Sequence, residues 1–171
     1  MSDSHGHCDA FLPIIGILCV DIAQPLQNLH GNEVHSYLAA SYVKYLETAG
    51  AKVIPIWLQR HKFDIRIQGE VFPPPKKIFP FFGAQFHPER VMFEHMGPQD
   101  HCHHCISCFK LNQYFARFFV DQCSKSDNRF ANYDDELRHS IYNFPSIYTA
   151  PLKLHWQHCF LFKADVDYKS N

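Results

Sequence analysis

The residues with the clearest chemical potential are His87 and Glu89, within the stretch Phe-Phe-Gly-Ala-Gln-Phe-His-Pro-Glu-Arg at residues 81–90. In an extended backbone, side chains two positions apart point to the same side. The Glu89 carboxylate could then hold the His87 imidazole, fix its tautomer and stabilise its protonated form, as the third member of a catalytic triad does. The predicted chemistry is acid–base catalysis, which needs a nucleophile for His87 to deprotonate.

A second pattern is His-Cys-His-His-Cys-Ile-Ser-Cys at residues 101–108, where cysteines separated by two residues follow or adjoin histidines. These side chains suit zinc or an iron–sulfur cluster. The pattern is incomplete, because no downstream pair stands at zinc-finger spacing and no fourth cysteine follows. We therefore expect no metal site, and the plainer interpretation is a helix N-terminus with incidental thiols. A small zinc-binding module over residues 95–108 is the alternative.

The composition predicts one domain with its own core, since 171 residues with 46% hydrophobic content can bury one. The 16 basic and 17 acidic residues nearly balance, which gives no reason to expect nucleic acid or a membrane as partner. Seven cysteines are an odd number and outline no disulfide framework. The N-terminus lacks a basic segment typical of a signal peptide, and no Asn-x-Ser/Thr sequon or bilayer-spanning stretch occurs. As written, the chain is expected in the cytosol.

The elements that must position these residues begin with an apolar run at 12–20, typical of a strand buried on both faces. A polar loop is expected at 21–33, and then a helix that Ser36 or Asn32 caps and Gly50 ends. The apolar stripe of that helix comprises Leu38, Tyr42, Tyr45, Leu46 and Ala49. A second strand at 51–57 completes a βαβ unit, which predicts a parallel sheet.

Farther along, residues 63–67 are ambiguous, 70–72 favour a short strand, and the prolines at 73–75 end regular structure. A strand at 79–86 would deliver His87, and a helix is predicted at 106–121. The aromatic stripe of this helix is predicted to face the core, with exposure as the alternative; it comprises Tyr114, Phe115, Phe118 and Phe119. Residues 128–138 read as a loop that enters a short acidic helix.

Four blocks in the same order resemble γ-glutamyl hydrolase, of the class I glutamine amidotransferase-like superfamily. The blocks are residues 13–18, 36–56, 82–90 and 142–149. The resemblance implies a doubly wound, three-layer α/β/α sandwich of the flavodoxin-like type, here with central strands and helices missing. We expect a disordered N-terminus at 1–10, a single truncated α/β domain at 11–165 and a C-terminal tail at 166–171.

The family removes γ-linked glutamates from folyl and antifolyl poly-γ-glutamates without a metal or organic cofactor. A cysteine attacks the γ-amide, a histidine acts as base and then acid, a glutamate orients the histidine, and backbone N–H groups hold the oxyanion. On the matching positions, His87 takes the acid–base role and Glu89 the orienting role. The resemblance also implies a folyl poly-γ-glutamate as small-molecule substrate, a dimer, and a secreted, lysosomal or vacuolar setting.

The chain departs from this family at the nucleophile. The family cysteine lies on a Gly-x-Cys-x-Gly turn before the histidine, and no cysteine here stands between glycines at that spacing. Pro74 and Pro75 stand where the family has two glycines, and proline has no backbone N–H to offer an oxyanion. An internal deletion accounts for both differences. We expect the chain to be inactive alone, and the alternative role is a non-catalytic subunit that associates through exposed core faces.

Overall fold

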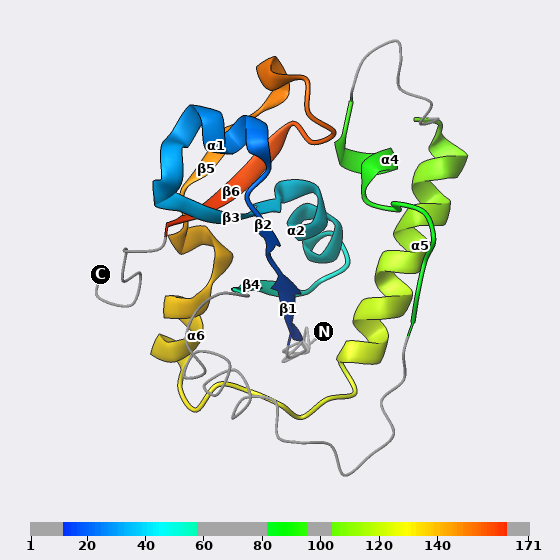
Figure 1. Ribbon diagram of the computed structural model, residues 1–171. Coiled ribbons are helices and arrows are strands. Elements are labelled where there is room, and N and C mark those ends of the chain that lie inside the picture. Colours follow the sequence, from blue (N-terminus) through cyan, green and yellow to red (C-terminus); the bar gives the residue numbers. More distant parts are fainter. Residues whose placement is uncertain (1–11, 58–81, 96–103, 164–171) are drawn as a thin grey trace, which may run out of the picture.

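The computed structural model describes residues 12–57, 82–95 and 104–163, which form a mixed α/β fold (Figure 1). Strands β1 (Ile14–Leu18) and β4 (Lys52–Ile56) pair in parallel, from Ile14 opposite Lys52 to Leu18 opposite Ile56. The predicted parallel pairing is confirmed. The prediction that the first strand is buried on both faces is wrong, because Ile15 is the buried residue of β1 and 56% of Leu18 is exposed.

The polar loop predicted at 21–33 is also wrong, because most of it is helical. Strand β2 (Val20–Asp21) is followed by helix α1 (Gln24–His30) and the 3₁₀ helix η1 (Gly31–Glu33). Pro25 lies in the first turn of α1, where its missing N–H leaves no helical hydrogen bond unmade. Leu26 is fully buried and anchors this helix.

The helix predicted from Ser36 or Asn32 begins later, because residues up to 39 form strand β3 (Val34–Ala39) and helix α2 comprises Ala40–Glu47. Val34, Ser36 and Leu38 are buried in alternation with half-buried neighbours, which is the two-residue period of a strand. The predicted caps are therefore wrong, and Ala39 precedes the helix without a side-chain cap bond. Gly50 has the expected positive φ, +93°.

The chain also builds an antiparallel sheet, in the order β2-β3-β6-β5. Its C-terminal strands are β5 (Ser146–Tyr148) and β6 (His158–Lys163), and the 3₁₀ helices η2 (Ile141–Asn143) and η3 (Ala150–Leu152) precede them. Strand β6 alternates between two cores: Phe160 and Phe162 join the larger one, and Cys159 and Leu161 join a smaller one with Leu26.

Helix α2 packs between strand β6 and helix α5 (Ile106–Cys123), and the short helix α4 (Arg90–Phe93) contacts both helices (Figure 1). Helix α5 confirms the helix predicted at 106–121. The acidic helix is confirmed as α6 (Tyr133–His139), whose N-cap Asn132 accepts a hydrogen bond from the Asp135 N–H. No described helix is long and apolar enough to cross a bilayer.

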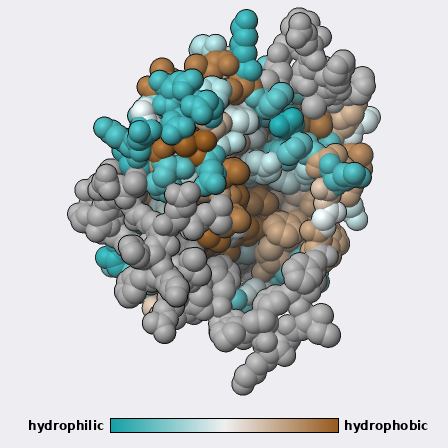
Figure 2. Space-filling view, viewed as in Figure 1, coloured by the Kyte–Doolittle hydropathy of each residue, from teal (hydrophilic) through white to brown (hydrophobic). Residues whose placement is uncertain are grey.

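The aromatic stripe of α5 lies mostly outside the core. Ala116 and Val120 are buried, whereas the exposed fractions of Tyr114, Phe115 and Phe118 are 63%, 37% and 38%. The core prediction is wrong for these three, and the exposed alternative is confirmed. Apolar residues also gather near the middle of the face shown in Figure 2.

Several predictions fall wholly or partly outside the described residues. The segments at 63–67, 70–72 and 73–75 are among them, as are the predicted N-terminal and C-terminal tails. Of the strand predicted at 79–86, the described part, 82–86, has no strand structure, so His87 is delivered by an irregular segment. The layered sandwich stays an expectation.

Candidate active site

The structure brings His87 and Glu89 together. The His87 Nδ1 lies 2.9 Å from the Glu89 Oε1, a hydrogen-bonding distance. The backbone is not extended as predicted: residues 88 and 89 form a turn, and Glu89 has helical φ and ψ of −68° and −31° as the N-cap of α4. The turn achieves the contact because it folds the Glu89 side chain back toward the imidazole.

Burial differs sharply between the two partners. The Glu89 side chain is 3% exposed, whereas the His87 side chain is 52% exposed. The carboxylate is thus a fixed internal anchor, and the imidazole faces solvent. With Nδ1 bound to Glu89, Nε2 is the nitrogen left to exchange a proton with a reacting group, which is the division of roles in a catalytic triad.

Tyr42 of α2 is the third member of this cluster, although its spacing in the sequence predicts only a place in the apolar stripe of a helix. Its hydroxyl lies 3.2 Å from the His87 Nδ1. Burial, and then the charge of Glu89 and a hydrogen bond to its carboxylate, raise the pKa of Tyr42 to about 12. The hydroxyl therefore stays protonated and donates to Glu89, which holds this carboxylate against α2.

The cysteines described by the structure do not complete a triad, since none of them lies within hydrogen-bonding distance of His87. Burial raises the pKa of both Cys19 and Cys159 to about 12, which disfavours the reactive thiolate. Cys19 follows the end of β1, and Cys159 lies in β6.

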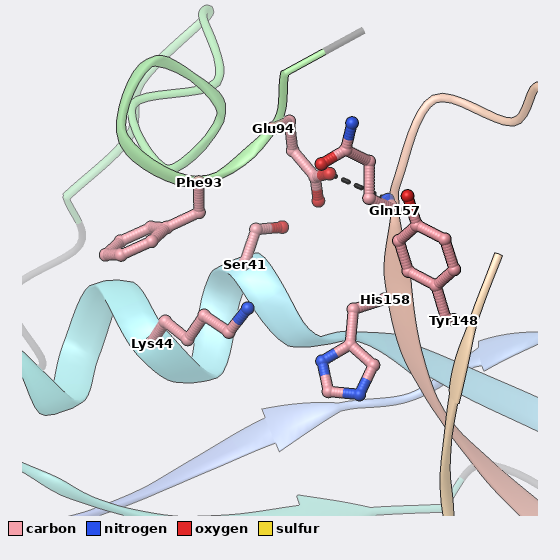
Figure 3. A pocket seen from close by; sticks show the side chains of 7 residues that line it. All are labelled: Ser41, Lys44, Phe93, Glu94, Tyr148, Gln157 and His158. Carbon is pink, nitrogen blue, oxygen red and sulfur yellow. Dashed lines mark hydrogen bonds between the residues drawn. The ribbon is translucent and has the colours of Figure 1, made fainter. Parts of the chain in front are cut away.

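A pocket of about 320 Å³ lies on the same two helices, between α2, α4 and the paired strands β5 and β6 (Figure 3). The residues that line it are Ser41, Lys44, Phe93, Glu94, Tyr148, Gln157 and His158. Phe93 follows Glu89 by one helical turn, and its N–H donates to the Glu89 carbonyl at 3.1 Å. The pocket is thus tied to the histidine–glutamate pair through α4, although neither of these two residues lines it.

The buried charge in this pocket is the carboxyl group of Glu94, which is 2% exposed. It accepts a hydrogen bond of 2.8 Å from the Gln157 backbone N–H, drawn as a dashed line in Figure 3, and one from the Ser41 hydroxyl. Burial nevertheless raises the pKa of Glu94. Burial, followed by the charge of Lys44, lowers the pKa of His158, so this imidazole is neutral near pH 7.

The alternative zinc module at 95–108 lies partly outside the described residues, since 96–103 are not described. Of its remaining members, His95 and His104 have ring centroids 4.5 Å apart with tilted ring planes, and Cys105 and Cys108 lie together at the start of α5. Within the described part of the chain, no group of three or more histidine, cysteine, aspartate or glutamate residues has metal-binding geometry.

Tyr42, Ser41 and Glu94 are site residues that the sequence did not predict. Tyr42 belongs to the predicted helix stripe and Ser41 precedes it in the same helix, whose first turn faces α4 and the pocket. Glu94 follows Glu89 by five residues, so its place beside the same short helix could have been inferred. The participation of Gln157 could not, because it depends on β6 pairing with β3.

Comparison with known proteins finds relatives that share one name. No protein-family model matches the chain. It is 26% identical to γ-glutamyl hydrolase of Homo sapiens over 166 residues, which cover 84% of this chain and 51% of the human protein. It is 32% identical to γ-glutamyl hydrolase of Rattus norvegicus over 71 residues, covering 42% of this chain and 22% of the rat protein.

A shorter match, 47% identical over 45 residues, is to γ-glutamyl hydrolase B of Dictyostelium discoideum, and covers 26% of this chain and 12% of that protein. The chain thus spans about half the length of the human relative, and less of the others is matched. The matched proteins share one name, and the human match extends over most of this chain. The chain is thus distantly homologous to γ-glutamyl hydrolase, at 26% identity over 84% of its length.

Proposed function

We propose that this chain is a γ-glutamyl hydrolase-like domain that retains the acid–base half of the active site and does not hydrolyse γ-glutamyl bonds by itself. In this proposal His87 is the general base and acid, and Glu89 orients it. The substrate class is folyl poly-γ-glutamate. The reaction in which this pair would take part is cleavage of a γ-linked amide. It requires a nucleophile in addition to His87 and Glu89, and no metal or organic cofactor.

The observation that carries the proposal is the 2.9 Å contact between a half-exposed imidazole and a carboxylate that is almost fully buried. In a general base the same arrangement is required, because Nε2 must reach the reacting group while Nδ1 stays fixed.

Two features support the inactivity of the chain alone. None of its described cysteines contacts His87, and the two most buried ones have thiol pKa values raised to about 12. Pro74 and Pro75 stand where the family offers backbone N–H groups to the oxyanion. Loss of a single oxyanion donor costs on the order of 10²- to 10³-fold in rate, and loss of the nucleophile costs more.

The test is release of glutamate from a folyl pentaglutamate by the purified chain, with human γ-glutamyl hydrolase as the positive control. The matched variant is His87→Ala, which removes the proposed base. We expect the wild-type chain and this variant to give the same background. Turnover by the wild-type chain that His87→Ala abolishes would show an active enzyme, and a series of Cys→Ser variants would then locate its nucleophile.

A second role, association through exposed core faces, is favoured by the aromatic surface over α5. Phe82 packs edge-on against Phe118 at 5.1 Å, and Phe86 packs against Phe115 at 5.6 Å between ring centroids. All four rings remain more than a third exposed, at 46%, 38%, 52% and 37%. Such a patch is typical of an interaction surface.

Light scattering after gel filtration tests this second role. We expect a dimer or larger species for the wild-type chain and a shift toward monomer for Phe115→Ser combined with Phe118→Ser. The matched control is Tyr133→Ser, which removes an aromatic ring outside this patch. Tyr133 lies on α6 and is 65% exposed. A wild-type monomer at high concentration would exclude the second role.

A further inference from the structure

The thiols of Cys105 and Cys108 meet at the start of α5. Their sulfur atoms lie 2.8 Å apart. A disulfide bond is about 2.05 Å long, so the two sulfurs need to approach by less than one ångström to bond. The sequence pattern predicts that these thiols have no common role, whereas the structure brings them into contact.

The two thiols differ in environment. Cys105 is exposed and is the N-cap residue of α5, where its sulfur accepts the Cys108 backbone N–H at 3.3 Å. Cys108 lies one turn inside the helix and is less exposed. Hydrogen bonds from the Cys108 thiol and backbone N–H lower the pKa of Cys105, whereas the neighbouring Cys105 sulfur raises the pKa of Cys108. Cys105 is thus the more exposed and the more acidic of the two thiols.

The surrounding contacts hold this pair in place. Asn112, which is 5% exposed, donates its side-chain N–H to the Cys108 carbonyl at 2.8 Å, and its own carbonyl accepts the Tyr45 hydroxyl at 2.8 Å. On the other side, the His104 Nδ1 lies 2.8 Å from the Val91 carbonyl oxygen. The turn that carries both thiols is therefore fixed to α2 and α4.

From this contact we infer a dithiol–disulfide site at Cys105 and Cys108, which exchanges with small-molecule disulfides of the glutathione class. It is independent of the proposed hydrolase function, since neither thiol contacts His87. The exposed Cys105 reacts first with the small molecule, and Cys108 resolves the mixed disulfide.

The exchange has two balanced steps. The Cys105 thiolate attacks one sulfur of the small disulfide, a bond forms between Cys105 and that sulfur, and the other sulfur leaves as a thiolate with the electron pair. Cys108 then loses its proton to solvent, and its thiolate attacks the Cys105 sulfur and displaces the second small thiolate. Both small thiolates take up protons. Two cysteine thiols are oxidised by two electrons, and one disulfide is reduced to two thiols.

The chain contains its own matched control, because Cys102 and Cys105 have the same spacing as Cys105 and Cys108. All three lie in one tryptic peptide, between Arg90 and Lys110. The Cys102→Ser variant leaves only the inferred pair in that peptide, and the Cys108→Ser variant leaves only the control pair. Each full-length variant is reduced, treated with a chelator, exposed to oxidised glutathione, quenched, and scored by mass spectrometry for a peptide lighter by two hydrogen atoms.

In the native chain, we expect Cys102→Ser to form its disulfide at least about tenfold faster than Cys108→Ser, because the thiols of the inferred pair are already in contact. In urea the two variants should oxidise at the same rate, since their spacing is identical. Equal rates in the native chain would overturn the inference. So would a Cys102→Ser variant that stays reduced when native but oxidises in urea, or a native rate no faster than the rate in urea.

Discussion

Replacement of Phe162 by alanine tests whether the C-terminal strand completes the core. Phe162 is fully buried in β6, and its ring packs edge-on against Trp57 at 5.8 Å and Phe144 at 5.2 Å between centroids. Truncation of a buried phenylalanine lowers the free energy of unfolding by about 3–5 kcal/mol. Because two aromatic contacts are lost together, we expect about 4 kcal/mol, most of the stability of a marginal domain.

Urea unfolding followed by tryptophan fluorescence measures this loss, since Trp57 lies beside the substituted ring. With a slope of about 2 kcal/mol per M urea, the midpoint should fall by about 2 M. The matched control is Phe115→Ala, which removes the same ring from a site that is 37% exposed and should cost less than about 1 kcal/mol. Equal midpoint shifts for the two variants would refute the burial of Phe162 and the packing of β6 in the core.

Three further predictions concern charge and thiol chemistry. Burial raises the pKa of Glu94 above 4.5, so the folded state binds this proton more tightly, and the free energy of unfolding should fall as the pH rises from 4.5 through the raised value. Glu94→Gln should lessen that fall in urea midpoints across pH; identical profiles would contradict it. Cys19 and Cys159, whose thiol pKa values are raised to about 12, should resist iodoacetamide in the folded chain, as peptide mapping can check, whereas alkylation as fast as in urea would show them accessible. Lys52→Ala breaks a half-exposed ion pair with Glu136 and should cost at most about 1 kcal/mol in urea unfolding, less at high salt; a larger, salt-insensitive loss would argue against a surface pair.

The elements that the sequence predicted correctly are those with one dominant period. Helix α5 has a long 3.6-residue pattern, and the parallel pair of β1 and β4 follows from two apolar runs on either side of a helix. Residues 34–39 misled the prediction because Leu38 fits two patterns at once. It falls on the stripe of the helix that follows, yet it is also the third buried position of an alternating strand. Pairing with Phe160 across the sheet decides between them, and sequence periodicity does not contain that contact.

The site residues also divide into those that a local sequence pattern predicts and those that depend on long-range contacts. The identity of the pair, His87 and Glu89, could be predicted because side chains two positions apart can meet through either an extended backbone or a turn. The turn itself could not, since Pro88 follows a segment without regular structure and the helix it opens is only four residues long. Tyr42 was missed for a different reason: its partner lies 45 positions away, and only the packing of α2 against α4 brings the two together.

The contacts that support His87 and Glu89 come from elements packed into the described core. Tyr42 reaches Glu89 and His87 from α2, while Ser41 and Lys44 on the same helix line the adjoining pocket. Successive residues of a helix point about 100° apart, so one short helix can serve α4 and the pocket at once. Helix α2 is itself held by β6 and α5. The described side-chain contacts of Glu89 are thus made with Tyr42 of α2 and with His87, so its position depends on the packing of α2 against β6, α4 and α5.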